Sequence, residues 1–186
     1  MVRRLSMAAF VMAVTTAGAA AQDLTYNLTA EVEPVCGAFS SAADADGAQD
    51  KDFGVLSDID TSTQVTATGG GGSITYVCNA PGGFTRTISS QNNGFLFREG
   101  TVGGGEDQIA YTVQHGGGSG LSFAERQLTA PEVSIFSGAP AFVEGQTGSI
   151  TFRTFGVRET TTNDAVATTV RAGTYTDVVT VAITAN

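Results

Sequence analysis

Few side chains in this sequence are of types that carry out chemistry. His115 is the only histidine among the 186 residues, so it cannot form a multi-histidine metal site. Gly118-Ser119-Gly120 contains a serine, but it lacks the spacing and the strand-to-helix turn of a Gly-x-Ser-x-Gly nucleophile motif. We therefore predict no catalytic residues, no bound metal and no cofactor, and we expect that the protein is not an enzyme.

An acidic run at residues 44–52 has some likeness to a calcium-binding loop. Alignment on Gly47 puts Phe53 where an EF-hand has its bidentate glutamate, and no helices flank the run. The residues of the run, from Asp44 to Asp52, are mostly small and polar, as in solvated loops. A solvated loop is the favoured interpretation, and an ion site is the alternative.

The first 21 residues have the features of an export signal. Arg3 and Arg4 precede an apolar core at residues 5–14, and small residues at 19–21 precede the predicted cleavage site. This core is shorter than the roughly 20 apolar residues of a membrane-spanning helix, and no later stretch approaches that length. We expect a soluble, exported protein with no membrane insertion.

The net charge limits the partners that the mature chain can have. Cleavage would remove two of the nine basic residues and none of the eighteen acidic ones, which leaves a net charge of −11. The remaining length fits one domain. Such a negative charge argues against binding to nucleic acids or to anionic membranes.

Cys36 and Cys78 are the only two cysteines. Because the compartment of an exported protein is oxidising, we predict that they form one disulfide, with two buried free thiols as the alternative. A bridge across a loop of roughly 40 residues stabilises a fold by about 4 kcal/mol in the chain-entropy model. It would also fix the start of the domain to the strand that ends at Cys78.

Residues 24–32 alternate between apolar and polar types without a break. This alternation predicts a strand with one apolar face, because successive side chains of a strand point to opposite sides. Pro34 would end the strand and separate it from the first strand of the domain at residues 35–39. The face comprises Leu24, Tyr26, Leu28, Ala30 and Val32. It covers either a surface of another molecule or part of its own sheet.

The rest of the chain is typical of an all-β sandwich. Short runs rich in β-branched and aromatic residues alternate with clusters of Gly, Ser, Asn and Asp, and we find no amphipathic helix. The predicted strands are residues 52–56, 64–67, 73–78, 84–90, 108–114, 132–136, 148–158 and 176–184. The glycine runs between them, including residues 69–72, are predicted to be turns or flexible loops.

The last predicted strand has Val179, Val181 and Ile183 on one face. A sandwich normally has a further strand that covers such an edge, and the sequence contains no candidate after it. We expect Asp177 to hold the preceding turn at Gly173 through hydrogen bonds to the backbone.

Several short motifs occur in an order that spans nearly all of the mature chain. They are Phe53-Gly54, Gly72-Ser73-Ile74-Thr75-Tyr76-Val77-Cys78, Ala110-Tyr111-Thr112-Val113, Phe155-Gly156-Val157 and Ala172-Gly173-Thr174-Tyr175-Thr176-Asp177-Val178-Val179-Thr180-Val181. Taken together with the alternating segment and the paired cysteines, they resemble the spore coat protein U family. That family includes pilus subunits of the archaic chaperone–usher class.

The resemblance implies an incomplete immunoglobulin-like sandwich that lacks its last strand. In that family a periplasmic chaperone lends a strand to the open groove, and an outer-membrane usher replaces it with the N-terminal strand of the next subunit. This exchange is donor-strand complementation, a form of strand addition. The chain would then consist of a signal peptide (1–21), a donor segment (22–35) and an incomplete domain (36–186).

The residues of the joint follow from the same resemblance. The donor side chains would be Leu24, Tyr26, Leu28, Ala30 and Val32. The last strand would line the acceptor groove with Val179, Val181 and Ile183.

The expected function is that of a structural subunit of a cell-surface pilus that supports adhesion or biofilm formation. Its partners would be neighbouring pilus subunits, a periplasmic chaperone and an outer-membrane usher, and it would reach the surface through the periplasm. The alternative is a monomeric secreted or spore-coat-like sandwich whose N-terminal strand completes its own fold. The sequence leaves open whether residues 24–32 act between molecules or within one.

Overall fold

The computed structural model describes residues 25–40, 49–56, 67–138, 140–154, 158–160, 166–168 and 170–186. The chain divides into two units, Met1–Val32 and Glu33–Asn186, and each is described by itself. The predicted export signal, Leu24 and residues 44–48 of the acidic run lie outside the described residues. The described part of the chain contains no helix that is long and apolar enough to cross a membrane.

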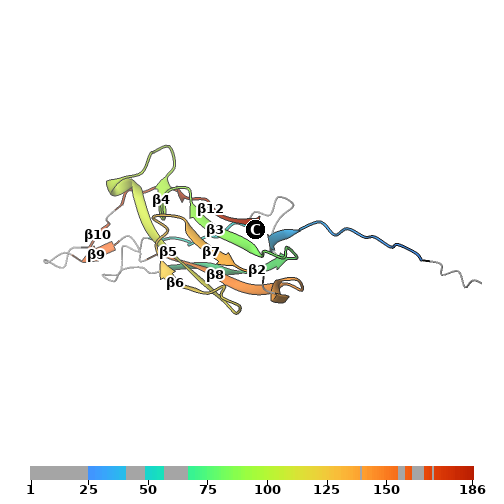
Figure 1. Ribbon diagram of the computed structural model, residues 1–186. Helices are drawn as coiled ribbons and strands as arrows, with labels where there is room; N and C mark the ends of the chain where they lie inside the picture. Colours follow the sequence, from blue (N-terminus) through green and yellow to red (C-terminus); the bar gives the residue numbers. More distant parts are fainter. Residues whose placement is uncertain are drawn as a thin grey trace, which may run out of the picture. The chain divides into compact units, whose positions relative to one another are not determined.

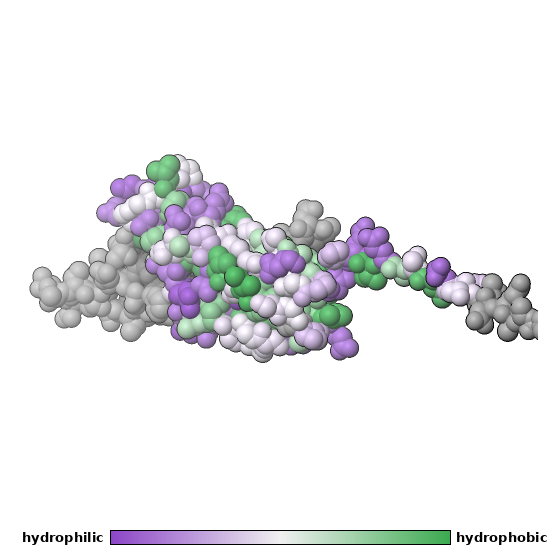
Figure 2. Space-filling model, viewed as in Figure 1, coloured by the Kyte–Doolittle hydropathy of each residue, from purple (hydrophilic) through white to green (hydrophobic). Residues whose placement is uncertain are grey.

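In the first unit, residues 25–32 are assigned neither helix nor strand (Figure 1). Figure 2 shows hydrophobic and hydrophilic residues in turn along this segment. Tyr26, Leu28 and Val32 are 74%, 92% and 81% exposed. The alternation therefore gives an apolar face, but a strand also needs a neighbour for its hydrogen bonds.

The larger sheet of the second unit has the strand order β1-β2-β8-β5-β4-β11, with β6 beside β5. Every pair in it is antiparallel. Its strands are β1 (Cys36–Phe39), β2 (Ala67–Cys78), β4 (Phe95–Arg98), β5 (Gln108–Gly117), β6 (Phe123–Arg126), β8 (Gln146–Thr154) and β11 (Tyr175–Thr176). Short 3-10 turns precede β5 (η1, Gly105–Asp107) and β8 (η2, Pro140–Phe142).

The second sheet contains β12 (Val179–Ala185), β3 (Phe84–Ser90) and β7 (Glu132–Phe136) in that order. The short strands β9 (Arg158–Thr160) and β10 (Val166–Thr168) form a separate antiparallel pair. Buried side chains from both larger sheets meet in one core, for example Ile88 of β3 with Val113 of β5 and Ile150 of β8. This arrangement confirms the predicted all-β, immunoglobulin-like sandwich.

Most of the predicted strands are found in place. Residues 84–90 and 132–136 are β3 and β7, and residues 73–78 and 108–114 lie within β2 and β5. The predicted strand 148–158 overlaps β8, and 176–184 overlaps β11 and β12, while residues 64–66 lie outside the described residues. Two strands of four residues each, β4 and β6, were not predicted, because runs this short carry little periodicity.

The glycine run at residues 69–72 lies inside β2, so the prediction of a turn there is wrong. The pairing between β2 and β8 shifts register between Gly69 and Gly72, which marks a β-bulge or similar irregularity. A Cβ atom at Gly71 would lie 3.1 Å from the backbone oxygen of Ile150. Glycine here allows the backbones of β2 and β8 to approach closely. A glycine run in a strand of this kind cannot be told from a glycine run in a turn by sequence alone.

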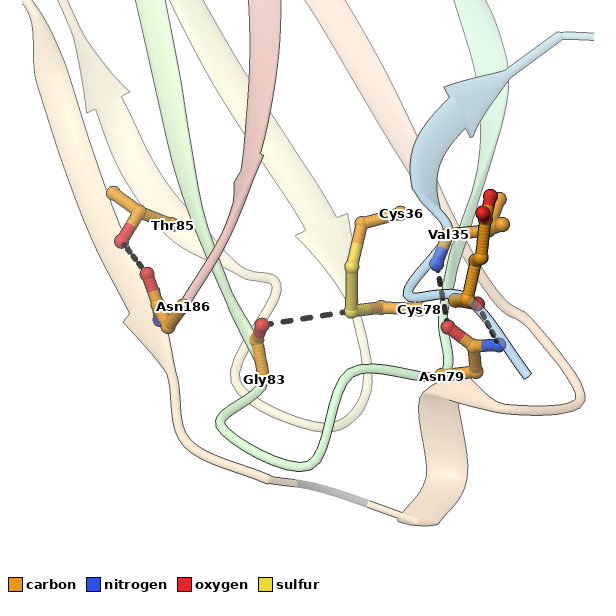
Figure 3. Close-up of a disulfide and its surroundings, with 8 residues drawn as sticks. Val35, Cys36, Cys78, Asn79, Gly83, Thr85 and Asn186 are labelled. Carbon is orange, nitrogen blue, oxygen red and sulfur yellow. Dashed lines mark hydrogen bonds between the residues drawn. A yellow bond between two sulfur atoms is a disulfide. The ribbon is translucent and has the colours of Figure 1, made fainter. Parts of the chain in front are cut away.

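Cys36 and Cys78 form a disulfide, which confirms the predicted pairing (Figure 3). They face each other as the first registered pair of β1 and β2. The bridge thus fixes the start of the domain to the end of β2, as expected.

The core also contains a histidine and an arginine. His115 of β5 is 1% exposed, and its Nε2 lies 2.8 Å from the hydroxyl of Tyr76. Arg86 of β3 is fully buried and donates to the backbone oxygen of Leu121 and to the hydroxyl of Ser134. Its guanidinium group lies over the rings of Tyr76, Phe123 and Phe136, a cation–π arrangement.

Burial lowers the pKa of His115 to about 4, and the nearby positive charge of Arg86 adds to this effect. The histidine is therefore neutral in the folded domain at neutral pH. A Cβ atom at position 148 would lie 2.4 Å from Cε1 of His115, so Gly148 is needed to accommodate the ring.

We predict that this histidine makes the domain sensitive to acid. The pKa of His115 is about 4 in the folded state and about 6.5 in an unfolded chain, so the unfolded state takes up the proton first as the pH falls. Above about pH 6.5, His115 is neutral in both states and does not lower the free energy of unfolding. Between about pH 6.5 and 4 the proton binds to the unfolded state alone, which lowers the free energy of unfolding by an amount on the order of 3 kcal/mol. Urea unfolding at several pH values measures it.

The matched control is His115→Gln, which keeps a polar side chain that does not titrate. Over the same pH range this variant should lose about 3 kcal/mol less of its free energy of unfolding than the parent. Equal losses in the two proteins would contradict the assignment.

Candidate functional site

A groove of about 1210 Å³ opens between the two sheets of the second unit. One wall consists of β12 and residues 170–178, and the other of the end of β1 and residues 49–56. Apolar side chains of the larger sheet form its floor: Ile74, Leu96, Ile109, Tyr111, Ile150 and Phe152. The groove therefore places an apolar surface directly beside a strand.

β12 forms its wall because its residues alternate. Val179, Val181 and Ile183 are half-buried, whereas the residues between them are exposed. The strand pairs with β3 along its whole length, and no strand of the described residues pairs with its other edge. Such an edge leaves a row of N–H and C=O groups free for another strand. This wall thus offers hydrogen bonds as well as apolar contacts.

The structure places the three predicted acceptor residues differently. Val179 and Val181 line the groove. Ile183 does not line it and packs against a core cluster that includes Tyr76 and Phe84, as Cys36 and Ala38 of the neighbouring β1 also do. β1 therefore closes one end of the groove.

Residues 49–56 form the opposite wall without regular secondary structure. Phe53 and Leu56 pack against the core, and the ring centroids of Phe53 and Tyr111 are 6.3 Å apart. The strand predicted at residues 52–56 is absent, so that prediction is wrong. The open groove separates this segment from β12, and no strand in the described part of the chain pairs with it.

Asp177 stabilises the part of the wall where β12 begins. Its Oδ2 accepts hydrogen bonds from the hydroxyl groups of Ser90 and Tyr111, each at 2.5 Å. Its Oδ1 accepts from the backbone N–H groups of Asn92 and Val178 at 3.0 and 2.8 Å. One carboxylate thus joins the turn after β3, the floor of the groove and the start of β12.

This role differs from the predicted one, in which Asp177 held the turn at Gly173. Its partners among the described residues are Ser90, Asn92, Tyr111 and Val178, and none of them belongs to that turn. Burial raises the pKa of Tyr111 far above its ordinary value, and the hydrogen bond to Asp177 raises it further. Tyr111 therefore remains a neutral donor.

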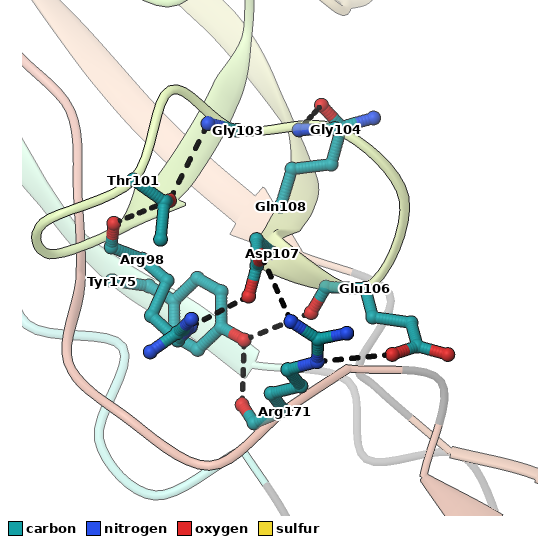
Figure 4. A network of polar contacts seen from close by, with 9 residues as sticks. All are labelled: Arg98, Thr101, Gly103, Gly104, Glu106, Asp107, Gln108, Arg171 and Tyr175. Atoms are coloured by element: carbon teal, nitrogen blue, oxygen red, sulfur yellow. Dashed lines mark hydrogen bonds and ion pairs between the residues drawn. The ribbon is translucent and has the colours of Figure 1, made fainter.

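A polar network holds residues 170–176 against the connection between β4 and β5 (Figure 4). Arg171 pairs with Glu106 at 3.1 Å and with Asp107 at 3.4 Å, and Arg98 pairs with Asp107 at 2.6 Å. The hydroxyl of Tyr175 donates to the backbone oxygen of Arg171 at 2.5 Å. The hydrogen bond from Arg98 holds the pKa of the Asp107 carboxyl below its usual range. These contacts position the wall at the end of the groove away from β1.

Some of these residues were not predicted. Leu96 lies in β4, which was not predicted. The three consecutive apolar residues after Gly94 are the sequence pattern that indicates this strand. Ser90 and Asn92 have no sequence signal of their own, because they act through the distant Asp177. Of the predicted donor side chains, Tyr26, Leu28, Ala30 and Val32 are exposed, and Leu24 lies outside the described residues.

The likeness of this chain to known proteins is weak. No protein-family model and no curated protein matches the chain. Among solved structures, a similar chain comes from a chaperone–tip adhesin complex described as vital for CFA/I fimbriae biogenesis. The two are 9% identical with a TM-score of 0.45, and the match covers 81% of this chain and 42% of that one. The present chain thus spans less than half the length of that protein.

We predict that Asp177→Ala lowers the free energy of unfolding by about 2–3 kcal/mol, because it removes the carboxylate that accepts from Tyr111, Ser90 and two backbone N–H groups. Tyr111→Phe removes only the donor and should cost about 1 kcal/mol. Urea unfolding of both variants and of the double mutant measures these losses. The double mutant should be at least about 0.5 kcal/mol more stable than the sum of the single losses implies. Strict additivity would contradict the proposed contact.

Proposed function

We propose that this chain is a structural subunit of a cell-surface fibre, in which residues 24–32 of one copy fill the groove of another. The observation that carries the proposal is the free edge of β12 above an apolar floor. The same chain contains an exposed segment with apolar side chains at every second position. A groove that lacks a strand and a strand that lacks a sheet are complementary.

The walls of the groove explain how a strand would be held. Its backbone would pair with the free edge of β12 on one side, as in other cases of strand addition. Its apolar side chains would cover floor residues such as Leu96 and Ile150. On the other side it would supply the neighbour that residues 52–56 lack, so that segment becomes a strand only when the groove is filled.

Burial of the donor side chains supplies the free energy of strand binding in the groove. Each large apolar side chain, among them Tyr26, Leu28 and Val32, gains about 1.5–3 kcal/mol when it leaves water. The whole segment gains on the order of 5–10 kcal/mol before the entropy of ordering is subtracted. This is comparable with the net stability of a domain, so a filled groove releases its strand very slowly.

The remaining parts of the proposal rest on the resemblance to the spore coat protein U family. The chain would be exported, held by a periplasmic chaperone that covers the groove, and assembled by an outer-membrane usher. An exposed edge is an aggregation hazard, which gives the chaperone its purpose. The fibre would support adhesion or biofilm formation, and the subunit would need neither catalysis nor a cofactor.

We predict that charge in either half of the joint blocks assembly. Val181→Asp would place a carboxylate in the groove, and Leu28→Asp would place one on the donor face, at a cost of several kcal/mol. Each variant alone should remain monomeric by size-exclusion chromatography with light scattering. Thr184→Asp is the matched control, because Thr184 is exposed on β12 and does not line the groove, so its variant should assemble normally.

A mixture of the two charge variants sharpens this test. The Leu28→Asp chain retains an intact groove and the Val181→Asp chain retains an intact donor segment, so the mixture should form a pair that cannot grow further. Assembly of either variant alone would contradict the proposal. A stable wild-type monomer with the amide of Leu28 protected from exchange would instead favour a self-completed sandwich.

We also predict that deletion of residues 23–32 abolishes polymerisation and leaves the groove functional. The truncated protein should bind a synthetic peptide of residues 22–33. A peptide with Leu28→Asp should bind at least about 100-fold more weakly, because several kcal/mol are lost at 1.4 kcal/mol per factor of ten. Isothermal titration calorimetry provides both affinities. Fibre formation by the truncated protein would show that the donor assignment is wrong.

A further inference from the structure

The side chain of Asn79 bridges two backbone groups on either side of Pro34. Its Oδ1 accepts a hydrogen bond from the N–H of Val35 at 2.6 Å, and its Nδ2 donates to the backbone oxygen of Glu33 at 3.1 Å. The backbone N–H of Asn79 also donates to the oxygen of Val35 at 3.1 Å. Figure 3 shows the two side-chain contacts of Asn79 beside the Cys36–Cys78 disulfide.

These bonds continue the pairing of β1 and β2 beyond their last registered pair. The strand ladder ends where Cys36 faces Cys78. Pro34 has no N–H group and cannot extend such a ladder in the ordinary way. An asparagine amide has both an acceptor and donors, so one side chain can bind the backbone before and after the proline.

We propose that Asn79 is a positioning residue that holds the backbone on both sides of Pro34, so that the domain anchors the chain from Glu33 onward. Without its side chain, the chain would be held only from Val35, through the backbone bond from Asn79, and Glu33 and Pro34 would be free to move. Two residues of extended chain add about 7 Å of reach. In a fibre, Asn79 would therefore limit the range of angles between successive subunits. This part of the inference rests on the proposed function, whereas the anchoring of the backbone at Pro34 does not.

Hydrogen exchange on the mature wild-type chain and two variants tests the bridge itself. Asn79→Ala removes both side-chain bonds and should speed exchange at the amide of Val35 about tenfold. Asn79→Asp keeps an acceptor for this amide and should stay within about threefold of the parent, although it loses the bond to Glu33. The amide of Val113 in the core is the internal control and should not change. Unchanged exchange at Val35 in Asn79→Ala would overturn the proposal.

The second readout is the geometry of assembled fibres. In electron micrographs, the angles between successive Asn79→Ala subunits should spread more widely than in the parent, while the affinity for the donor peptide stays the same. An equal spread of angles would overturn the positioning role. If the wild-type chain formed no fibres, the proposed function would fail, and the exchange experiment would still decide whether Asn79 holds the junction.

Discussion

The structure depends on one constraint, the edge of β12 that no strand among the described residues covers. A strand at the edge of a sheet has backbone groups without partners, and this one also borders apolar side chains of the opposite sheet. Both deficits lie in the same groove, so one added strand with an apolar face corrects both. Residues 49–56 show the cost of the deficit, since they remain irregular although Phe53 and Leu56 pack on the core.

Three separate devices keep the groove in shape around this deficit. The Cys36–Cys78 bridge holds β1 against β2, so β1 closes one end. Asp177 joins the start of β12 to the floor, and the Arg171 network fixes the wall that leads into it. Each device links segments that are distant in the sequence, and none places a polar group in the apolar floor except the neutral hydroxyl of Tyr111. The groove is therefore shaped before any strand enters it.

The sequence predicted those features that depend on local pattern. β3 and β7 were found with their limits because turn residues bound their apolar alternation, and two cysteines leave one possible pair. Residues 52–56 have a strand pattern but pair with no strand that the structure describes, and no local pattern reveals this. The partners of Asp177 escaped for a related reason, since Ser90 lies 87 residues away along the chain. The position of Ile183 outside the groove likewise depends on a tertiary contact, its packing against the core cluster around Tyr76.

The most direct test is to ask which molecule fills the groove. A photo-reactive amino acid replaces Leu28 in a mixture of nitrogen-14 and nitrogen-15 labelled chains that assembles together, and mass spectrometry identifies the cross-linked peptides. If residues 24–32 act between molecules, we expect cross-links in which a nitrogen-14 peptide is joined to a nitrogen-15 peptide. These cross-links should join position 28 to groove residues such as Val179, Val181 or Ile150. Cross-links found only within chains of one label would contradict this expectation, because residues 24–32 would then complete their own sandwich.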